Sequence, residues 1–329
     1  MAIITTQNLS KSYRVAIKQA GLRGTWQHFW RRQYQDIPAV QDISFTIEAG
    51  EVVGFLGANG AGKTTTLKML VGLVQPSSGL VRVAGHDPFL RSAEFLRKIT
   101  LVMGQKQQLI WDLPALESLR INAAVYDVPD RLFQQRLKEL SEMLNLQDKL
   151  TQPVRKLSLG ERMKAELLAS LIHRPDILFL DEPTLGLDVN AQSSVREFLK
   201  EYNRQYGATI LLTSHYMTDI TALCDRILLI HGGRLIYDGQ LTDLLAQCAP
   251  LRQIKVELSQ PFCPDQFSSQ FAQLIETDGC SLRFAVRQAE LTKAVAEILA
   301  HLPVVDLTVS DPPIEETIAN LFRAGGVKG

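Results

Sequence analysis

A glycine-rich loop in the first quarter of the chain has the residue types that bind a chain of phosphates. Its glycines let the backbone wrap an anion with the N–H groups pointing inward, and the helix that follows adds its positive N-terminal end. Lys63 is expected to reach the β- and γ-phosphates of ATP, and the Thr64 hydroxyl to bind Mg²⁺. The loop residues expected to contact the nucleotide are Gly57, Asn59, Gly60, Ala61, Gly62, Lys63, Thr64 and Thr65.

A second candidate is a pair of acids, Asp181 and Glu182, that ends the apolar run at 176–183. Ligands of α/β sheets bind at the carboxyl ends of the strands, where these acids are expected. Asp181 suits Mg²⁺, directly or through water, and Glu182 is placed to orient or deprotonate an attacking water. Because strands often end in solvated acids, this interpretation depends on the phosphate loop occurring in the same chain.

A third candidate is the run Leu157-Ser-Leu-Gly-Glu, which opens an expected helix. The Ser158 hydroxyl and the Gly160 amide can present donors to an anion at that helix end. By itself the run would be interpreted as an ordinary helix cap. It gains weight only from the loop and the acids.

These residues must be positioned by short apolar strands that alternate with helices. This alternation indicates an α/β fold with a largely parallel core sheet. Helices are expected at 63–74 and, as a helical lobe, within 106–175, with the clearest helical spacing at 115–150. Strands are expected at 3–8, 43–56, 82–85, 99–103, 176–183, 209–215 and 226–233.

The pattern changes after residue 248 and predicts a small appended α+β domain at 249–329. Strands are expected at 252–258, 281–287 and 304–310, and helices near 264–275, 289–301 and 313–324. None of the phosphate-binding motifs lies in this part of the chain. It is therefore expected to regulate or dimerise rather than to catalyse.

Composition limits the function classes. The 329 residues contain 35 Lys and Arg and 35 Asp and Glu, so the zero net charge gives no overall attraction to nucleic acid. No apolar stretch approaches the roughly 18 residues that span a bilayer, and the N-terminus does not resemble a secretory signal. The four cysteines lack CxxC spacing, which favours reduced thiols over a metal or redox site. Together these features predict a cytoplasmic protein.

Taken in order, the motifs resemble those of the ATP-binding cassette ATPases over roughly residues 3–245. The set comprises the loop, the signature at 157–161, the acidic strand, Leu185-Gly-Leu-Asp188 and His215. The resemblance implies a P-loop NTPase core with an antiparallel β subdomain and a helical lobe. It adds Gln105 and His215 to Lys63 and Glu182 as catalytic residues, with Gln105 also at the metal. Gln107 and Gln108 are close alternatives, and Gln105 is preferred because it directly follows the expected strand run ITLVMG. It adds to the nucleotide contacts Tyr13, Ser158, Gly160, Glu161 and Asp188.

The resemblance also implies that the signature of one subunit completes the ATP site of another. Because each motif occurs once, two chains are needed, and a head-to-tail homodimer with two composite sites is the simplest arrangement. The usual signature is LSGGQ, whereas this chain has Leu159 and Glu161. Glu161 either places an acid near the phosphates, which is unfavourable for like charges, or points elsewhere.

An inserted segment at about 14–38 is basic and aromatic, with no acid between Lys11 and Gln35 and with Trp26, Phe29 and Trp30 at helical spacing. It could lie on an anionic membrane or a partner, or pack on its own domain. It also resembles the insertion of cassettes paired with exporter-type permeases, as does the stretch at 105–114 that contains Trp111.

The function expected is therefore that of the ATP-hydrolysing subunit of a membrane exporter, with residues 1–248 as the nucleotide-binding domain. Its partners would be separate permease chains and a second copy, with no nucleic acid, on the inner face of the cell membrane. The alternative is a soluble cassette ATPase that acts on ribosomes or nucleic acid. A small-molecule kinase with the same loop is disfavoured by the signature and His215.

Overall fold

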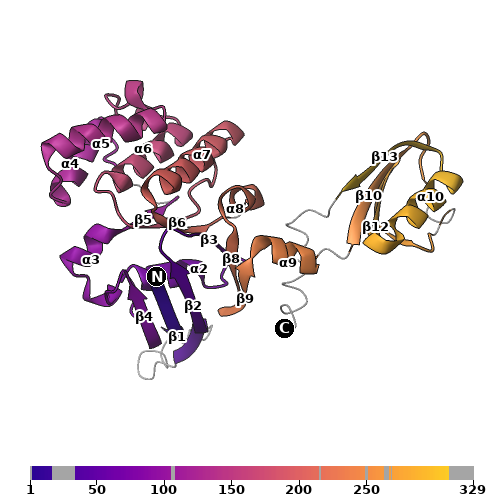
Figure 1. Ribbon diagram of the computed structural model, residues 1–329, viewed down its shortest axis with the longest axis horizontal. Coiled ribbons are helices and arrows are strands. Elements are labelled where there is room, and N and C mark those ends of the chain that lie inside the picture. The colour runs from indigo at the N-terminus through magenta and orange to yellow at the C-terminus, as the bar shows by residue number, and fades with distance from the viewer. Residues whose placement is uncertain are drawn as a thin grey trace, which may run out of the picture. The chain divides into compact units, whose positions relative to one another are not determined.

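The computed structural model describes residues 2–16, 34–104, 108–214, 216–248, 251–262, 267 and 269–310. The chain forms two compact units, Met1–Gly239 and Gln240–Gly329 (Figure 1). All the phosphate-binding motifs named above belong to the first unit. Gln105, His215 and the part of the basic aromatic segment at 17–33 lie outside the described residues.

The core of the first unit is a six-stranded sheet in the order β5-β6-β7-β3-β8-β9. The strands β5, β6, β7, β3 and β8 pair in parallel, and the residues of β6 from Ile177 to Leu180 are fully buried. The parallel α/β core predicted from the sequence is confirmed. Its strands are β3 (Val52–Leu56), β5 (Ile99–Met103), β6 (Ile177–Asp181), β7 (Thr209–Thr213), β8 (Arg226–His231) and β9 (Arg234–Gln240).

A separate antiparallel sheet has the order β2-β1-β4, with β1 (Ala2–Ala16), β2 (Tyr34–Glu48) and β4 (Ser78–Val83). The strand region expected at 43–56 is divided between β2 and β3 by a turn at Gly50, which has φ of 81°. The strand expected at 82–85 ends earlier, since Ala84 and Gly85 adopt positive φ in a turn. The insertion expected at 14–38 begins within β1 and ends within β2, so its first and last described residues lie in paired strands.

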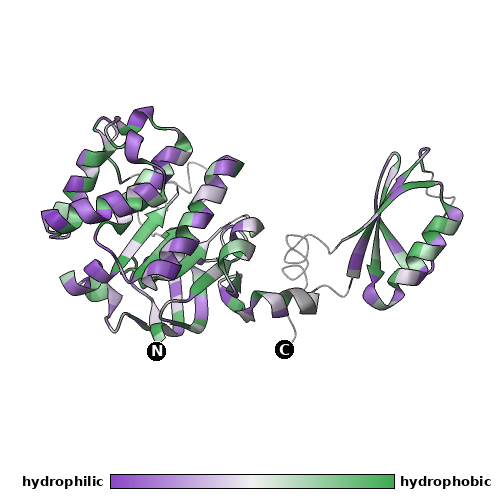
Figure 2. Ribbon diagram, turned by 45° about the horizontal axis from the view of Figure 1, so that its top comes forward, coloured by the Kyte–Doolittle hydropathy of each residue, from purple (hydrophilic) through white to green (hydrophobic). Residues whose placement is uncertain are grey.

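Helices cover the core sheet. Figure 1 shows α4, α5 and α6 gathered on one side as the helical lobe, and in Figure 2 hydrophobic residues concentrate on the strands while hydrophilic ones cover the outer helix surfaces. The helical stretch expected at 115–150 is broken before Pro129, where Asp127 has φ of 52°. The helices are α2 (Lys63–Leu70), α3 (Ala93–Lys98), α4 (Ala115–Val125), α5 (Asp130–Met143), α6 (Leu159–Leu171), α7 (Val189–Tyr206) and α8 (Met217–Leu223).

The second unit contains α9 (Leu241–Cys248) and a four-stranded antiparallel sheet in the order β11-β12-β10-β13, with α10 (Leu291–His301). Its strands are β10 (Leu251–Leu258), β11 (Ala272–Asp278), β12 (Ser281–Arg287) and β13 (Val304–Ser310). Its core contains Phe284 of β12 and Ile298 of α10. The helix expected near 264–275 is wrong over 272–275, because these residues pair with β12 as β11. The helix expected at 313–324 lies outside the described residues.

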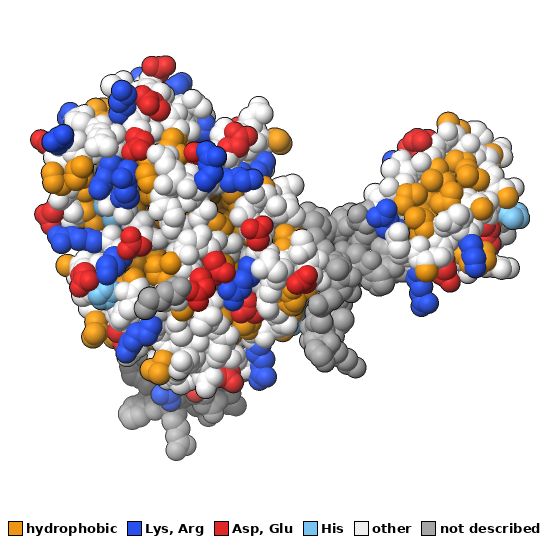
Figure 3. All heavy atoms as spheres, viewed as in Figure 1, with side chains coloured by type: hydrophobic (Ala, Val, Ile, Leu, Met, Phe, Trp, Pro, Cys, Tyr) orange, Lys and Arg blue, Asp and Glu red, His pale blue; other side chains and the backbone are white. Residues whose placement is uncertain are grey.

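Figure 3 shows acidic and basic side chains interspersed over the visible face of the first unit, in keeping with the balanced charge. Within the described ranges, no helix has the length and hydrophobicity needed to span a membrane.

Candidate active site

The phosphate loop connects β3 to α2, as the sequence predicts. Two of its glycines are fixed by close backbone approach, since a Cβ on Gly57 would lie 2.5 Å from the Ile230 carbonyl oxygen and one on Gly62 would lie 2.5 Å from that of Ala39. Gly60 has open space around it but adopts φ of 79°, which disfavours any residue with a side chain. Local geometry therefore requires glycine at Gly57 and Gly62 and favours it at Gly60.

Lys63 begins α2 and folds back over the loop. Its ammonium donates to the carbonyl oxygens of Gly57 at 2.6 Å and Ala58 at 3.2 Å. Burial lowers the pKa of Lys63, and the carboxylates of Glu182 and Asp181 oppose that shift. The loop thus holds a buried cation that can exchange these carbonyls for an anion.

The loop and the acidic strand meet at Asp181, the last residue of β6. The Thr64 hydroxyl donates to Asp181 Oδ2 at 3.0 Å, and the Thr213 hydroxyl of β7 donates to Asp181 Oδ1 at 2.7 Å. Two motifs that are 117 residues apart in sequence therefore share one hydrogen bond. A hydroxyl and a carboxylate side by side are hard oxygen donors of the kind that suits Mg²⁺.

Glu182 follows β6 with φ of 56°, a left-handed conformation that is uncommon for a residue with a side chain. Its N–H donates to the Thr213 carbonyl and hydroxyl oxygens, each at 3.1 Å. Gly104, after β5, packs so closely that an added Cβ would lie 2.2 Å from the Glu182 carbonyl oxygen. Neighbouring strands therefore hold Glu182 in its strained conformation, as is common at functional positions.

The signature opens α6 with Ser158 at the N-cap. The Glu161 N–H donates to Ser158 Oγ at 3.2 Å, and the Ser158 N–H donates to Glu161 Oε2 at 2.9 Å, which forms a capping box. Lys149 forms an ion pair with Glu161 Oε1 at 2.9 Å. The Ser158 N–H and Lys149 lower the pKa of Glu161. Its carboxylate is thus bound within its own subunit.

Replacing Glu161 with glutamine is expected to leave ATP-dependent association unchanged, because glutamine keeps the capping box and loses only the Lys149 ion pair. That partly exposed pair contributes less than about 1 kcal/mol. Urea unfolding of E161Q, K149Q and the double variant measures the contribution of this ion pair. The double variant should lose less stability than the sum of the two single variants, because both remove the same pair. Association tightened about fivefold in E161Q would instead mean that the carboxylate faces the phosphates.

Residues near the signature pack α6 against α7. A Cβ on Gly160 would lie 2.6 Å from the Ala191 side chain, so glycine permits this contact. Asp188 caps α7, accepting from the Ala191 N–H at 2.8 Å. Leu159 and Val189 remain 49% and 77% exposed, so each helix start carries an exposed apolar side chain.

Tyr13 lies on β1, opposite Ile37 on β2, and is 39% exposed. The Lys11 ammonium lies 5.3 Å from the centre of its ring. Tyr13 therefore keeps part of its surface available for stacking.

Asp219 on α8 is a residue that sequence analysis missed. It is fully buried and accepts from Ser214 Oγ at 2.6 Å, from Arg196 Nη1 at 2.9 Å and from the Thr184 hydroxyl. Thr184 follows Glu182 by two residues, and Ser214 precedes His215. Asp219 thus joins the loops that follow β6 and β7. The sequence signal is weak, since Asp219 is the one acid in a short helix that also contains two threonines.

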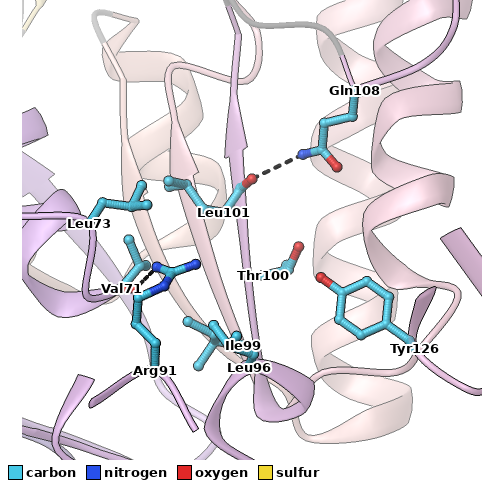
Figure 4. Close-up of a pocket in the computed structure, with 9 residues that line it drawn as sticks. All are labelled: Val71, Leu73, Arg91, Leu96, Ile99, Thr100, Leu101, Gln108 and Tyr126. Atoms are coloured by element: carbon cyan, nitrogen blue, oxygen red, sulfur yellow. Dashed lines mark hydrogen bonds between the residues drawn. The ribbon is translucent and has the colours of Figure 1, made fainter. Parts of the chain in front are cut away.

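A pocket of about 190 Å³ lies between the core sheet and the helical lobe (Figure 4). The Gln108 side chain donates to the Leu101 carbonyl oxygen at 3.1 Å on one side of it, and Tyr126 points toward it from the lobe. Leu73 at its rim is 53% exposed. The lining residues are Val71, Leu73, Arg91, Leu96, Ile99, Thr100, Leu101, Gln108 and Tyr126.

Residues 40–185 match the family model described as ABC transporter, and residues 250–310 match that of the C-terminal domain of EvrA-like ABC transporters. The ABC transporter ATP-binding protein NatA of Bacillus subtilis is 40% identical over 217 residues, covering 65% of this chain and 88% of that protein. The linearmycin resistance ATP-binding protein LnrL of the same organism is 31% identical over 299 residues, covering 88% and 96%.

A Nod factor export ATP-binding protein I from Cupriavidus pinatubonensis is 37% identical over 215 residues, covering 65% of this chain and 66% of that protein. Among solved structures, an ATP-binding subunit of an ABC transporter superposes with a TM-score of 0.61 at 26% identity, covering 74% of this chain and 92% of the other. A dimeric ATP-binding cassette bound to ADP and Pi shares the fold, with a TM-score of 0.60 at 23% identity and coverage of 72% and 98%.

Proposed function

This chain belongs to the ABC transporter family of ATP-binding proteins, and on that basis we propose that it drives an exporter through separate permease chains. Family membership makes it an ATP-binding and hydrolysing transporter subunit rather than a cassette ATPase of ribosomes or nucleic acid. Two of its relatives are named for Nod factor export and linearmycin resistance, which supports the exporter assignment. The observation that carries the proposed site is the Thr64–Asp181 hydrogen bond, which joins the two motifs.

In the proposed site, the loop N–H groups surround the phosphates of ATP and Lys63 leaves the Gly57 and Ala58 carbonyls to bind the β- and γ-phosphates. Tyr13 stacks on the adenine. Thr64, Asp181 and Gln105 are the residues that would hold Mg²⁺. When bound, that ion would neutralise charge on the β- and γ-phosphates.

For hydrolysis, we assign Glu182 as the group that positions a water in line with the γ-phosphate and accepts its proton. The restrained backbone at Glu182 supports this role, because a fixed base needs no reorganisation. His215 and Gln105 complete the catalytic group. Asp219 accepts hydrogen bonds from Ser214, which precedes His215, and from Thr184, which follows Glu182. It would thereby fix the position of His215 relative to Glu182.

We also propose that the working form is a head-to-tail homodimer. Ser158 and Gly160 of one copy would donate to the γ-phosphate held by Lys63 of the other, with Asp188 nearby. Ser158 is exposed at the start of α6, and the exposed Leu159 and Val189 follow Ser158 and Asp188 directly in sequence. Burial of these apolar side chains against a second copy would add to the association.

The test of this assembly uses E182Q, which should hold ATP without hydrolysing it. Sedimentation velocity with saturating ATP should show a dimer, and the same protein with ADP should show a monomer, because ADP lacks the bridging γ-phosphate. The matched control, K63A in the E182Q background, should remain monomeric with ATP. Monomer under all conditions would contradict a homodimer that ATP alone assembles.

The pocket between the core sheet and the lobe is the proposed docking surface for the permease. Its lining combines five apolar residues with the polar groups of Arg91, Thr100, Gln108 and Tyr126, and Leu73 and Leu90 nearby are 53% and 77% exposed. Docking there would place the chain at the inner face of the cell membrane. Purification from native membranes should recover a multi-helix membrane protein with the chain, and L73E should weaken that recovery.

We assign residues 1–248 to nucleotide binding and 249–329 to a regulatory or dimerisation domain. The separate hydrophobic core of the second unit and the match of 250–310 to a family C-terminal domain support this division, although α9 groups with the second unit. Hydrophobic side chains gather on its visible face in Figure 3, and its exposed hydrophobic residues include Leu299 and Val305.

A further inference from the structure

The stretch from Gln108 to Trp111 has neither helix nor strand, yet side chains of the lobe hold its backbone. The Gln108 N–H donates to both carboxylate oxygens of Glu166 at 3.0 Å, and the Leu109 N–H donates to Glu166 Oε1 at 3.2 Å. The Ile110 N–H donates to Ser118 Oγ on α4 at 3.0 Å. Three successive backbone donors thus depend on two buried side chains.

Glu166 lies on α6, eight residues after Ser158, and is only 4% exposed. A buried carboxylate is costly unless it is hydrogen-bonded. Burial raises the pKa of Glu166, and the N–H groups of Gln108 and Leu109, with the charge of Arg162, oppose that rise. The backbone N–H groups of Gln108 and Leu109 therefore stabilise the buried carboxylate of Glu166.

Arg162 provides a second contact from the same face of α6, one turn before Glu166. Its guanidinium carbon lies 4.3 Å from the centre of the Trp111 ring, which is a close cation–π arrangement. The signature helix therefore holds the stretch at both ends, at Gln108 by hydrogen bonds and at Trp111 by stacking.

The same stretch is tied to the core sheet. The Gln108 side chain donates to the Leu101 carbonyl oxygen of β5, as Figure 4 shows, and β5 pairs with β6 up to Met103 opposite Asp181. Gln108 also lines the pocket. A continuous set of contacts therefore runs from the strand that ends at Asp181, through Gln108, to the helix that begins at Ser158.

We propose that Glu166 and Arg162 form a clamp, the Glu166–Arg162 clamp, that makes the signature helix move with the stretch at 108–111. Glu166 is then a positioning residue: it sets the place of Ser158 relative to the core sheet without contacting ATP. This inference rests on the proposed function, because Ser158 is taken to complete the ATP site of a second copy.

The test compares E166A with its parent in the E182Q background. ATP affinity, measured by equilibrium dialysis, should stay within about twofold, since the hydrogen-bond partners of Glu166 lie at 108–109 and not in the phosphate loop. The dissociation constant of the ATP-bound dimer should rise about tenfold or more, because the clamp loses hydrogen bonds to a charged group. E166Q, which keeps one acceptor oxygen, should recover part of the loss. E117A, which removes a partly exposed acid of the same lobe that pairs with Arg120, should match the parent.

The behaviour of the parent tests the proposed function, and the behaviour of the Glu166 variants tests the clamp. If the parent does not dimerise with ATP, the proposed assembly is wrong. If the parent dimerises and both Glu166 variants dimerise equally well, the clamp is wrong. If E166A and E166Q lose ATP binding and dimerisation together, Glu166 is a general stability residue and the positioning role is overturned.

Discussion

Replacement of Glu182 by glutamine is expected to leave ATP binding intact and to lower turnover by about 10²- to 10⁴-fold, the usual contribution of a positioned general base. Glutamine has almost the same shape but cannot accept a proton from water at neutral pH. The phosphate loop, Lys63 and the Thr64–Asp181 hydrogen bond remain unchanged. Phosphate release and nucleotide titration on the same preparation measure the two properties separately.

The matched control is E197Q, which makes the same change at an exposed acid on α7. It should hydrolyse ATP at the parental rate. Parental turnover in E182Q would show that another group activates the water. A loss of ATP binding in E182Q would show that Glu182 supports the site rather than the chemistry.

Replacement of Lys63 by alanine should have its largest effect on ATP binding itself. The buried ammonium is expected to exchange two carbonyl contacts for charged phosphate oxygens. A hydrogen bond to a charged group contributes about 1.5–3 kcal/mol, so ATP affinity should fall by at least about 10- to 100-fold. Equilibrium dialysis with ATP measures the change.

The control for K63A is K68A, which removes a lysine from the last turn of the same helix. It should bind ATP as the parent does. The melting temperature of K63A without nucleotide should change little, because the hydrogen bonds lost to Gly57 and Ala58 are offset by removal of a buried charge. Parental ATP affinity in K63A would contradict the role given to this lysine.

Local patterns were enough to predict most of the core. The phosphate loop and the acidic strand each carry their signal within fewer than ten residues, and β5, β12 and β13 begin and end as expected. The orientation of Glu161 was left open, although serine followed three residues later by glutamate is itself the pattern of a capping box. The deciding partner, Lys149, is distant in sequence.

Other features depend on tertiary packing and could not be predicted. Asp219 and Glu166 are acids on apolar helix faces, and only the folded chain brings their partners to them. The first four residues of β11, 272–275, were expected to be helical because the apolar residues of this strand are spaced irregularly. Its conformation is set by pairing with β12.

The central claim is that each ATP site combines Lys63 of one copy with Ser158 of the other. It is tested by mixing two inactive chains, K63A and S158D. Aspartate keeps the helix cap at Ser158 but places a negative charge toward the γ-phosphate, so S158D alone should not hydrolyse ATP.

In a mixed dimer, both lesions fall in one site, and the other site combines the intact Lys63 of the S158D chain with the intact Ser158 of the K63A chain. Random pairing would make half of the dimers mixed, each with one intact site of two, and K63A is not expected to pair with itself, so the mixture should recover at least about a quarter of the parental ATPase rate. An equimolar mixture no more active than the two variants measured separately would contradict the composite site.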